Sequence, residues 1–116
     1  MKFEIDRKRW LRGEGSVNSR LLRPSDQKMC CLGFKAKALG LSDDTISNIP
    51  SPISIPNINF EQWGVTGLGR YAVIAELGDM YCLLFVTNDV RNISESEREE
   101  RLIKLFAEIG DEVTFV

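Results

Sequence analysis

The sequence predicts an α+β fold: one compact domain in which a small sheet packs against two helices. Three observations lead to this prediction. Short segments of alternating apolar and polar residues stand at both ends of the chain, at 2–6 and 111–116. A nearly continuous apolar stretch covers about 29–39, and apolar residues recur every three or four positions over about 95–109. We therefore expect residues 1–116 to form a single domain, with both terminal strands in one sheet covered by a buried helix and an amphipathic C-terminal helix.

The first quarter of the chain is predicted to be irregular after its opening strand. Phe3 and Ile5 share one face of that strand. Residues 7–13 are strongly basic and fit a short turn or helix around Trp10. Residues 13–28 are rich in Gly, Ser, Asn and Asp and are typical of a loop, which a pair of leucines at 21 and 22 would anchor to the core.

A buried helix over about 29–39 is predicted to end at Gly40, because glycine adopts the left-handed conformation that closes many helices. Ser42 can cap a second, short helix over 43–47, where two aspartates suit the positive end of the helix dipole. Residues 49–60 hold three prolines among spaced isoleucines and are predicted to form an extended arm.

The region 71–87 allows two interpretations. Two apolar segments, 71–77 and 80–87, are separated by Gly78 and Asp79, and their aromatic and β-branched content favours a hairpin. Residues 80, 83, 84 and 87 also fit one face of a helix, so periodicity leaves both structures open.

The C-terminal elements have clear boundaries. Ser94 and Glu97 have the spacing of a capping box, which predicts a helix from about 95. Gly110 ends that helix at about 109. The remaining residues alternate, with Val113 and Phe115 on one side, and form a strand suited to lie beside the N-terminal one.

Composition indicates a folded, cytoplasmic protein. Hydrophobic residues make up 43% and charged residues 28%, which is ordinary for a globular chain. The longest apolar run, Met80 to Val86, is far shorter than the ~20 residues that cross a bilayer, so no membrane association is expected. The three cysteines include an adjacent pair, Cys30 and Cys31, and we interpret all three as reduced thiols.

Histidine is absent, which removes the usual base from Ser-His and Cys-His pairs and the commonest nitrogen ligand of metals. We expect no cofactor and no metal. Cys30 or Cys31 can act as a nucleophile if the helix dipole and Lys28 stabilise a thiolate, so a thiol-dependent enzyme is one alternative. We favour the other interpretation, in which both are small buried core residues.

The N-terminal third is basic although the net charge is −2. Residues 1–40 carry ten Lys and Arg against four acids. Guanidinium groups beside Trp10 can hold phosphates and stack on a base, which predicts a site for a small anionic nucleotide or for nucleic acid. The alternative is a solvated basic face that pairs with the acidic C-terminal helix. A pI of about 5.2 favours a small ligand over duplex DNA.

Several motifs resemble those of small uncharacterised proteins encoded by phages and prophages. They are W-L-R-G at 10–13, K-M-C-C-L-G-F at 28–34, N-D at 88–89 and V-T-F-V at 113–116. The resemblance implies a helix before the Asn-Asp pair and a small accessory protein that acts by binding. With Arg20 from the basic region, the matching positions give this candidate ligand-binding set: Trp10, Arg12, Arg20, Lys28, Cys31, Asn88 and Asp89.

These observations together favour a non-enzymatic counter-defence inhibitor in the cytoplasm of a host cell. It would either block a host defence protein or sequester a phosphate-bearing nucleotide. A protein partner would be contacted through the isoleucine-proline arm at 49–58 or the acidic helix, and the apolar arm is also suited to a homodimer. The alternatives from other classes are the thiol-dependent enzyme and a nucleic-acid-binding protein that uses the basic N-terminal third.

Overall fold

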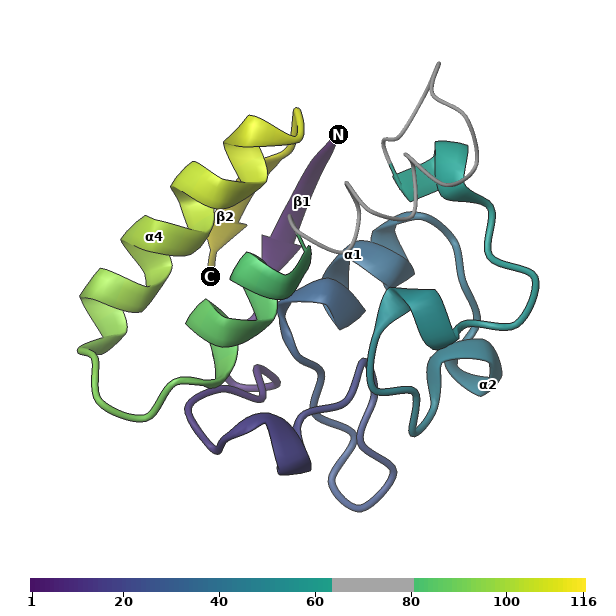
Figure 1. The fold of residues 1–116 in the computed structure, drawn as a ribbon, viewed down its shortest axis with the longest axis horizontal. Helices are drawn as coiled ribbons and strands as arrows, with labels where there is room; N and C mark the ends of the chain where they lie inside the picture. The colour runs from purple at the N-terminus through teal and green to yellow at the C-terminus, as the bar shows by residue number, and fades with distance from the viewer. Residues whose placement is uncertain (64–80) are drawn as a thin grey trace.

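A computed structural model describes residues 1–63 and 81–116 and shows an α+β fold (Figure 1). The radius of gyration is 13.3 Å, close to the ~13 Å expected for a compact chain of this length. Within the described residues, no helix is long and apolar enough to cross a membrane. The labelled elements, in chain order, are β1 (Lys2–Ile5), η1 (Ser16–Asn18), α1 (Cys31–Ala38), α2 (Asp43–Ile46), η2 (Pro52–Ser54), η3 (Phe60–Trp63), α4 (Glu95–Glu108) and β2 (Glu112–Phe115), where η marks a 3-10 helix.

The predicted pairing of the terminal strands is confirmed. β1 and β2 run parallel, with Phe3 opposite Val113 and Ile5 opposite Phe115. Phe3, Ile5 and Val113 are buried, while the alternate residues of both strands are exposed, as the period of two requires. The amino group of Met1 contacts Asp111 Oδ1 at 3.1 Å and so ties the two ends of the chain together.

Helix α1 forms the centre of the core. Its residues from Cys31 to Ala36 are all buried, which confirms the predicted buried helix, although the helix begins two residues later than expected. Met29 instead forms a parallel β-bridge with Trp10. Gly33 lets the loop approach closely, because a Cβ atom there would lie 1.9 Å from the backbone oxygen of Leu21. Gly40 adopts a φ of 89°, as the predicted helix end requires.

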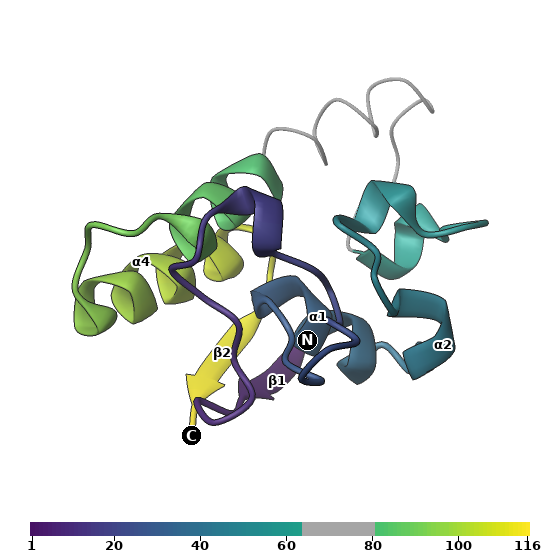
Figure 2. The ribbon, with the colours of Figure 1, turned by 90° about the horizontal axis from the view of Figure 1, so that it is seen from below.

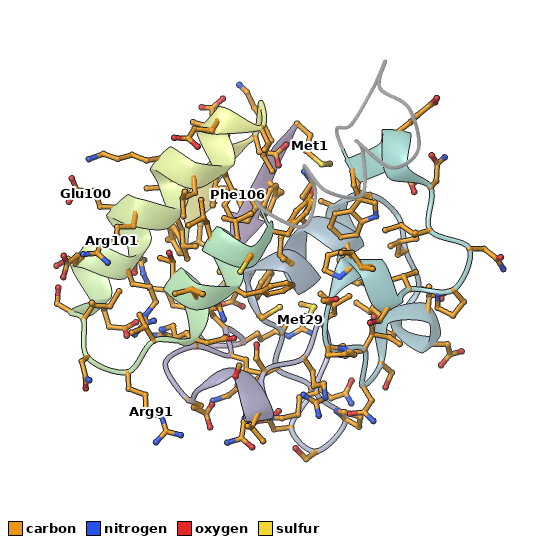
Figure 3. The ribbon with its side chains drawn as sticks, viewed as in Figure 1. Met1, Met29, Arg91, Glu100, Arg101 and Phe106 are labelled. Carbon is orange, nitrogen blue, oxygen red and sulfur yellow. The ribbon has the colours of Figure 1, made fainter. Side chains whose placement is uncertain are left out.

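The capping predictions for α2 and α4 are confirmed. Ser42 Oγ accepts from the Thr45 amide at 3.2 Å, and Ser94 Oγ accepts from the Glu97 amide at the same distance. Helix α4 buries a stripe that includes Phe106, whose ring meets Phe3 edge-to-face at a centroid distance of 5.2 Å. Figure 3 shows Phe106 pointing from α4 toward the interior, while Glu100 lies on the outer side.

One sequence prediction is corrected and one open choice is resolved. Residues 81–89 are helical, which is the helix alternative for 80–87 and not the hairpin, while 71–77 lies outside the described residues. The expected extended arm at 49–60 contains the short 3-10 helix η2 and packs inward, with Pro52 and Ile55 buried. An extended arm would have left its isoleucines in water, at a cost of roughly 2 kcal/mol for each side chain kept exposed.

The helices lie mainly on one side of the two strands. In Figure 2 the strands are at the lower edge, with α1 above β1, and α4 and the helical segment 81–89 above β2. Both views place α2, η2 and η3 on the opposite side of the molecule from α4, whereas η1 lies near the helical segment 81–89. The basic segment 7–13 is a turn followed by the Trp10 bridge, and it runs beside the end of the helical segment 81–89.

Candidate functional site

Asn88, at the end of the helical segment 81–89, joins three distant parts of the chain. Its Oδ1 accepts from the indole N–H of Trp10 at 2.8 Å and from the Cys31 amide at 3.0 Å. Its Nδ2 donates to the backbone oxygen of Leu11 at 3.0 Å and to Asp89 Oδ1 at 2.8 Å. Asn88 is fully buried, and these four bonds use the hydrogen-bonding capacity of its amide. The predicted residues Trp10, Cys31, Asn88 and Asp89 therefore meet, and their polar groups are engaged with one another.

Asp89 is a buried carboxylate beside this cluster. Only 7% of its surface is exposed. Burial raises its pKa, and the Asn88 amide and the positive charge of Arg98 oppose that rise. The backbone oxygen of Asp89 accepts from the Gly15 amide at 3.0 Å, so this residue also holds the N-terminal loop.

Arg98 bonds the free carbonyl groups at the C-terminal end of the helical segment 81–89. It projects from α4, is 2% exposed, and its Nη1 donates to the backbone oxygens of Thr87 at 2.8 Å and Asn88 at 2.9 Å. The Gly13 amide donates to the same Asn88 oxygen at 2.9 Å. These donors satisfy carbonyl groups that a helix end leaves without intrahelical partners.

Sequence reasoning did not include Arg98 in the candidate site, although a signal was present. Arg98 lies four residues before Leu102 and eight before Phe106, which places an arginine within the apolar stripe of an amphipathic helix. A charged residue at such a position must find buried partners.

Arg12 is held on the surface of the Trp10 ring. Its guanidinium carbon lies 4.4 Å from the ring centroid, and its Nη1 donates to the backbone oxygens of Arg7 at 3.1 Å and Trp10 at 3.0 Å. Its Nε donates to the Glu95 carboxylate at the start of α4. The predicted pairing of a guanidinium with the indole is present, and its charge is directed to a carboxylate of the same chain.

Arg20 and Lys28 lie apart from the contacts of Asn88. Arg20 Nε donates to Asn48 Oδ1 at 3.1 Å, and its Nη1 donates to the backbone oxygen of Ser19 at 2.6 Å. Lys28 is half-buried next to Met29, and the Trp10–Met29 bridge places its backbone opposite that of Arg9. The seven predicted positions therefore do not form one convergent set.

The basic N-terminal third pairs extensively with acids. Arg7 Nη2 lies 2.7 Å from Glu99 Oε1 on α4, and this carboxylate raises the pKa of Arg7. Arg23 Nη2 lies 2.6 Å from Asp26 Oδ2, which lowers the pKa of Asp26 to about 2. The Arg7 and Arg12 contacts to α4 match the alternative in which the basic face pairs with the acidic helix, whereas the Arg23–Asp26 pair lies within the N-terminal third.

The cysteines differ in accessibility. Cys30 and Cys31 are completely buried, and burial raises the pKa of Cys30 to about 12 and that of Cys31 well above its usual value. Such thiols hold almost no thiolate at neutral pH. Cys82, on the helical segment 81–89, is exposed. In the described parts of the chain, no three Cys, Asp or Glu side chains are grouped so as to hold a metal ion.

The helical segment 81–89 is apolar on its outward face as well as on its buried face. Tyr81 and Leu84 are buried, whereas Leu83 is 51% exposed and Val86 is 60% exposed. Leu83 and Val86 are three residues apart and so are neighbours on the helix surface, and the exposed Cys82 precedes them. We call Cys82, Leu83 and Val86 the outer face of this segment.

In comparisons with known proteins, no family model, no curated protein and no solved structure matches the chain. The function is therefore argued from the contacts described above.

Proposed function

We propose that this chain is a non-enzymatic accessory protein of the phage type that acts in the cytoplasm of a host cell by binding and blocking a host protein. The observation that carries the proposal is the outer face of the helical segment 81–89, where Leu83 and Val86 are each at least half exposed on adjacent turns. Isolated exposed apolar residues are common on proteins, but apolar neighbours on one helix offer a surface that a partner can desolvate.

Several hydrogen bonds hold one end of the segment that carries this surface. The C-terminal end of the segment is fixed by Arg98 from α4 and by the amides of Gly13 and Gly15. Asn88 connects the same end to Trp10 and to α1. A surface held in this way loses little conformational entropy on binding, which favours affinity.

The nucleotide alternative has weaker support from the site. The side-chain amide of Asn88 and the indole N–H of Trp10 are already engaged within the chain, and Arg12 is paired with Glu95. A phosphate would have to displace these internal partners. The thiol-enzyme alternative is opposed by the burial of Cys30 and Cys31 and by their raised pKa values.

Affinity capture with matched variants tests the proposal. The tagged wild-type protein, Leu83→Asp and Ile53→Asp are each used to capture proteins from a bacterial host lysate. Ile53 is a suitable control because it is 48% exposed and lies in the alternative binding arm. We expect a stoichiometric partner with wild type and with Ile53→Asp, and its loss with Leu83→Asp.

Three outcomes contradict the proposal: no stoichiometric partner for the wild-type protein, equal capture by Leu83→Asp, or loss of the partner with Ile53→Asp alone. Circular dichroism confirms that each variant is folded. Calorimetric titration of the wild-type protein with cyclic and ADP-ribose-type nucleotides tests the nucleotide alternative separately.

A further inference from the structure

The outer edge of β1 carries backbone groups that the described part of the chain leaves unpaired. The Glu112 and Val116 amides donate to the oxygens of Met1 and Ile5, so the odd-numbered residues of β1 direct their backbone groups toward β2. The backbone groups of Lys2 and Glu4 must then point to the opposite edge. None of the residues in 1–63 and 81–116 forms a hydrogen bond with them there.

Among residues 1–63 and 81–116, the sheet consists of two short parallel strands, which is an incomplete structure. β1 and β2 are four residues each, and the helices of the described residues cover one face of the pair. Parallel sheets are usually covered on both faces, and two strands alone are marginally stable in water. The exposed face is shallowly hollowed, with a volume of about 250 Å³ lined by Lys2, Phe3, Glu4, Glu112 and Thr114. A further strand at the edge of β1 would extend this sheet.

The charges on β1 are complementary to a second copy of β1 in the antiparallel direction. If Phe3 lies opposite Phe3 of the second copy, Lys2 lies opposite the second copy's Glu4, and Glu4 opposite its Lys2. Opposite charges at directly facing positions stabilise a strand pair. In this register Lys2 and Glu4 are also the residues whose backbone groups point outward, so each facing pair can exchange both N–H···O bonds.

We propose that two copies of this chain associate through antiparallel pairing of their β1 strands, centred on Phe3, to form a four-stranded sheet with the order β2–β1–β1–β2. The Lys2 side chain is free to take part, because it is 84% exposed and its contact with Glu112 is long, at 3.5 Å. The arrangement is a closed two-fold dimer, which leaves the edges of β2 on the outside and does not propagate into a fibre.

Charge-exchange variants test this register. Lys2→Glu places two acids opposite two acids in a homodimer, and Glu4→Lys places two bases opposite two bases. We expect a concentration-dependent dimer for the wild-type protein in sedimentation equilibrium and a dissociation constant weaker by at least about tenfold for each variant alone. Mixing the two variants restores opposite charges at every facing position, so the mixture is expected to form a heterodimer.

Glu100→Lys is the control, because it makes the same change of charge as Glu4→Lys at an exposed position on α4. It is expected to dimerise like the wild-type protein. A wild-type protein that stays monomeric at high concentration overturns the proposal, as does a dimer unaffected by either variant or a mixture that fails to associate. This test is independent of the outer face of 81–89, because it requires no host protein.

Discussion

Asn88 accepts a hydrogen bond from the indole of Trp10 at 2.8 Å across 78 positions of sequence, and the same oxygen accepts from the Cys31 amide. One buried side chain thereby holds the N-terminal bridge, the start of α1 and the end of the helical segment 81–89. Trp10, Cys31 and Asn88 belong to the motifs singled out in the sequence, and their hydrogen bonds hold the end of the helix that carries the proposed binding surface.

Asn88→Ala is expected to destabilise the protein by about 3 kcal/mol or more. The substitution leaves the Trp10 indole, the Cys31 amide and the Leu11 carbonyl buried without their partner. Urea denaturation followed by tryptophan fluorescence measures the change. Asn18→Ala is the control, because Asn18 is exposed and makes one long contact of 3.4 Å, and it is expected to cost less than about 0.5 kcal/mol. Similar values for the two variants would contradict a supporting role for Asn88.

The buried ion pair between Lys35 and Asp111 is expected to respond unequally to removal of its two partners. Their closest atoms are 2.5 Å apart, with side chains 2% and 4% exposed. Asp111→Asn leaves the Lys35 ammonium buried without a counter-ion and is expected to cost about 3–5 kcal/mol. Lys35→Met is expected to cost less, because Asp111 keeps the amino group of Met1 at 3.1 Å. Thermal and urea unfolding compare the two, and a larger loss for Lys35→Met would contradict this assignment.

Asp89 is expected to make the protein less stable as the pH rises. Its pKa is raised in the folded state, so the folded chain holds this proton more tightly than the unfolded chain. The stabilisation from protonated Asp89 is therefore complete below the usual aspartate pKa and is lost as the pH rises through the raised value. The unfolding free energy of the wild-type protein minus that of Asp89→Asn, measured from pH 3 to 7, should fall with increasing pH. A difference that rises with pH would contradict the burial argument.

The three thiols are expected to react in two classes. Native protein treated with iodoacetamide at pH 8 should take up one label, at Cys82, because Cys30 and Cys31 are buried and the pKa of Cys30 is raised to about 12. In urea all three should react. Peptide mass spectrometry locates the labels. Rapid native labelling of Cys30 or Cys31 would instead favour the thiol-enzyme alternative.

Local signals predicted much of the fold. The Ser94 cap, the stripe ending at Phe106 and Gly110 determine α4 through interactions within a few residues of one another. The terminal strands were predicted by alternation alone. By contrast, the arm at 49–60 packs inward because Ile55 is buried in the core, a contact between distant segments that overrides the local preference for an extended chain. The segment 81–89 adopts one of the two structures that its local pattern allowed, and its end is bonded to Arg98 of another helix.

The sequence pattern brought together some residues that are in contact in the structure. Trp10, Cys31, Asn88 and Asp89 do come together, but sequence could not show that they satisfy one another, since their partners lie in segments far apart in the chain. The partners of the basic residues were equally hidden in the sequence, because Arg12 and Arg7 pair with Glu95 and Glu99 in a distant segment. The outer face of 81–89 could not be recognised while helix and hairpin remained open.

The proposed function requires a partner protein to cover the outer face of 81–89, and Cys82 on that face provides the most direct measurement. The rate of Cys82 alkylation is compared for the free protein and for its stoichiometric complex with the captured partner. We predict that the rate falls by at least about tenfold in the complex, because a tightly packed interface excludes solvent and reagent. An unchanged rate in a complex that is shown to be stoichiometric would contradict the claim.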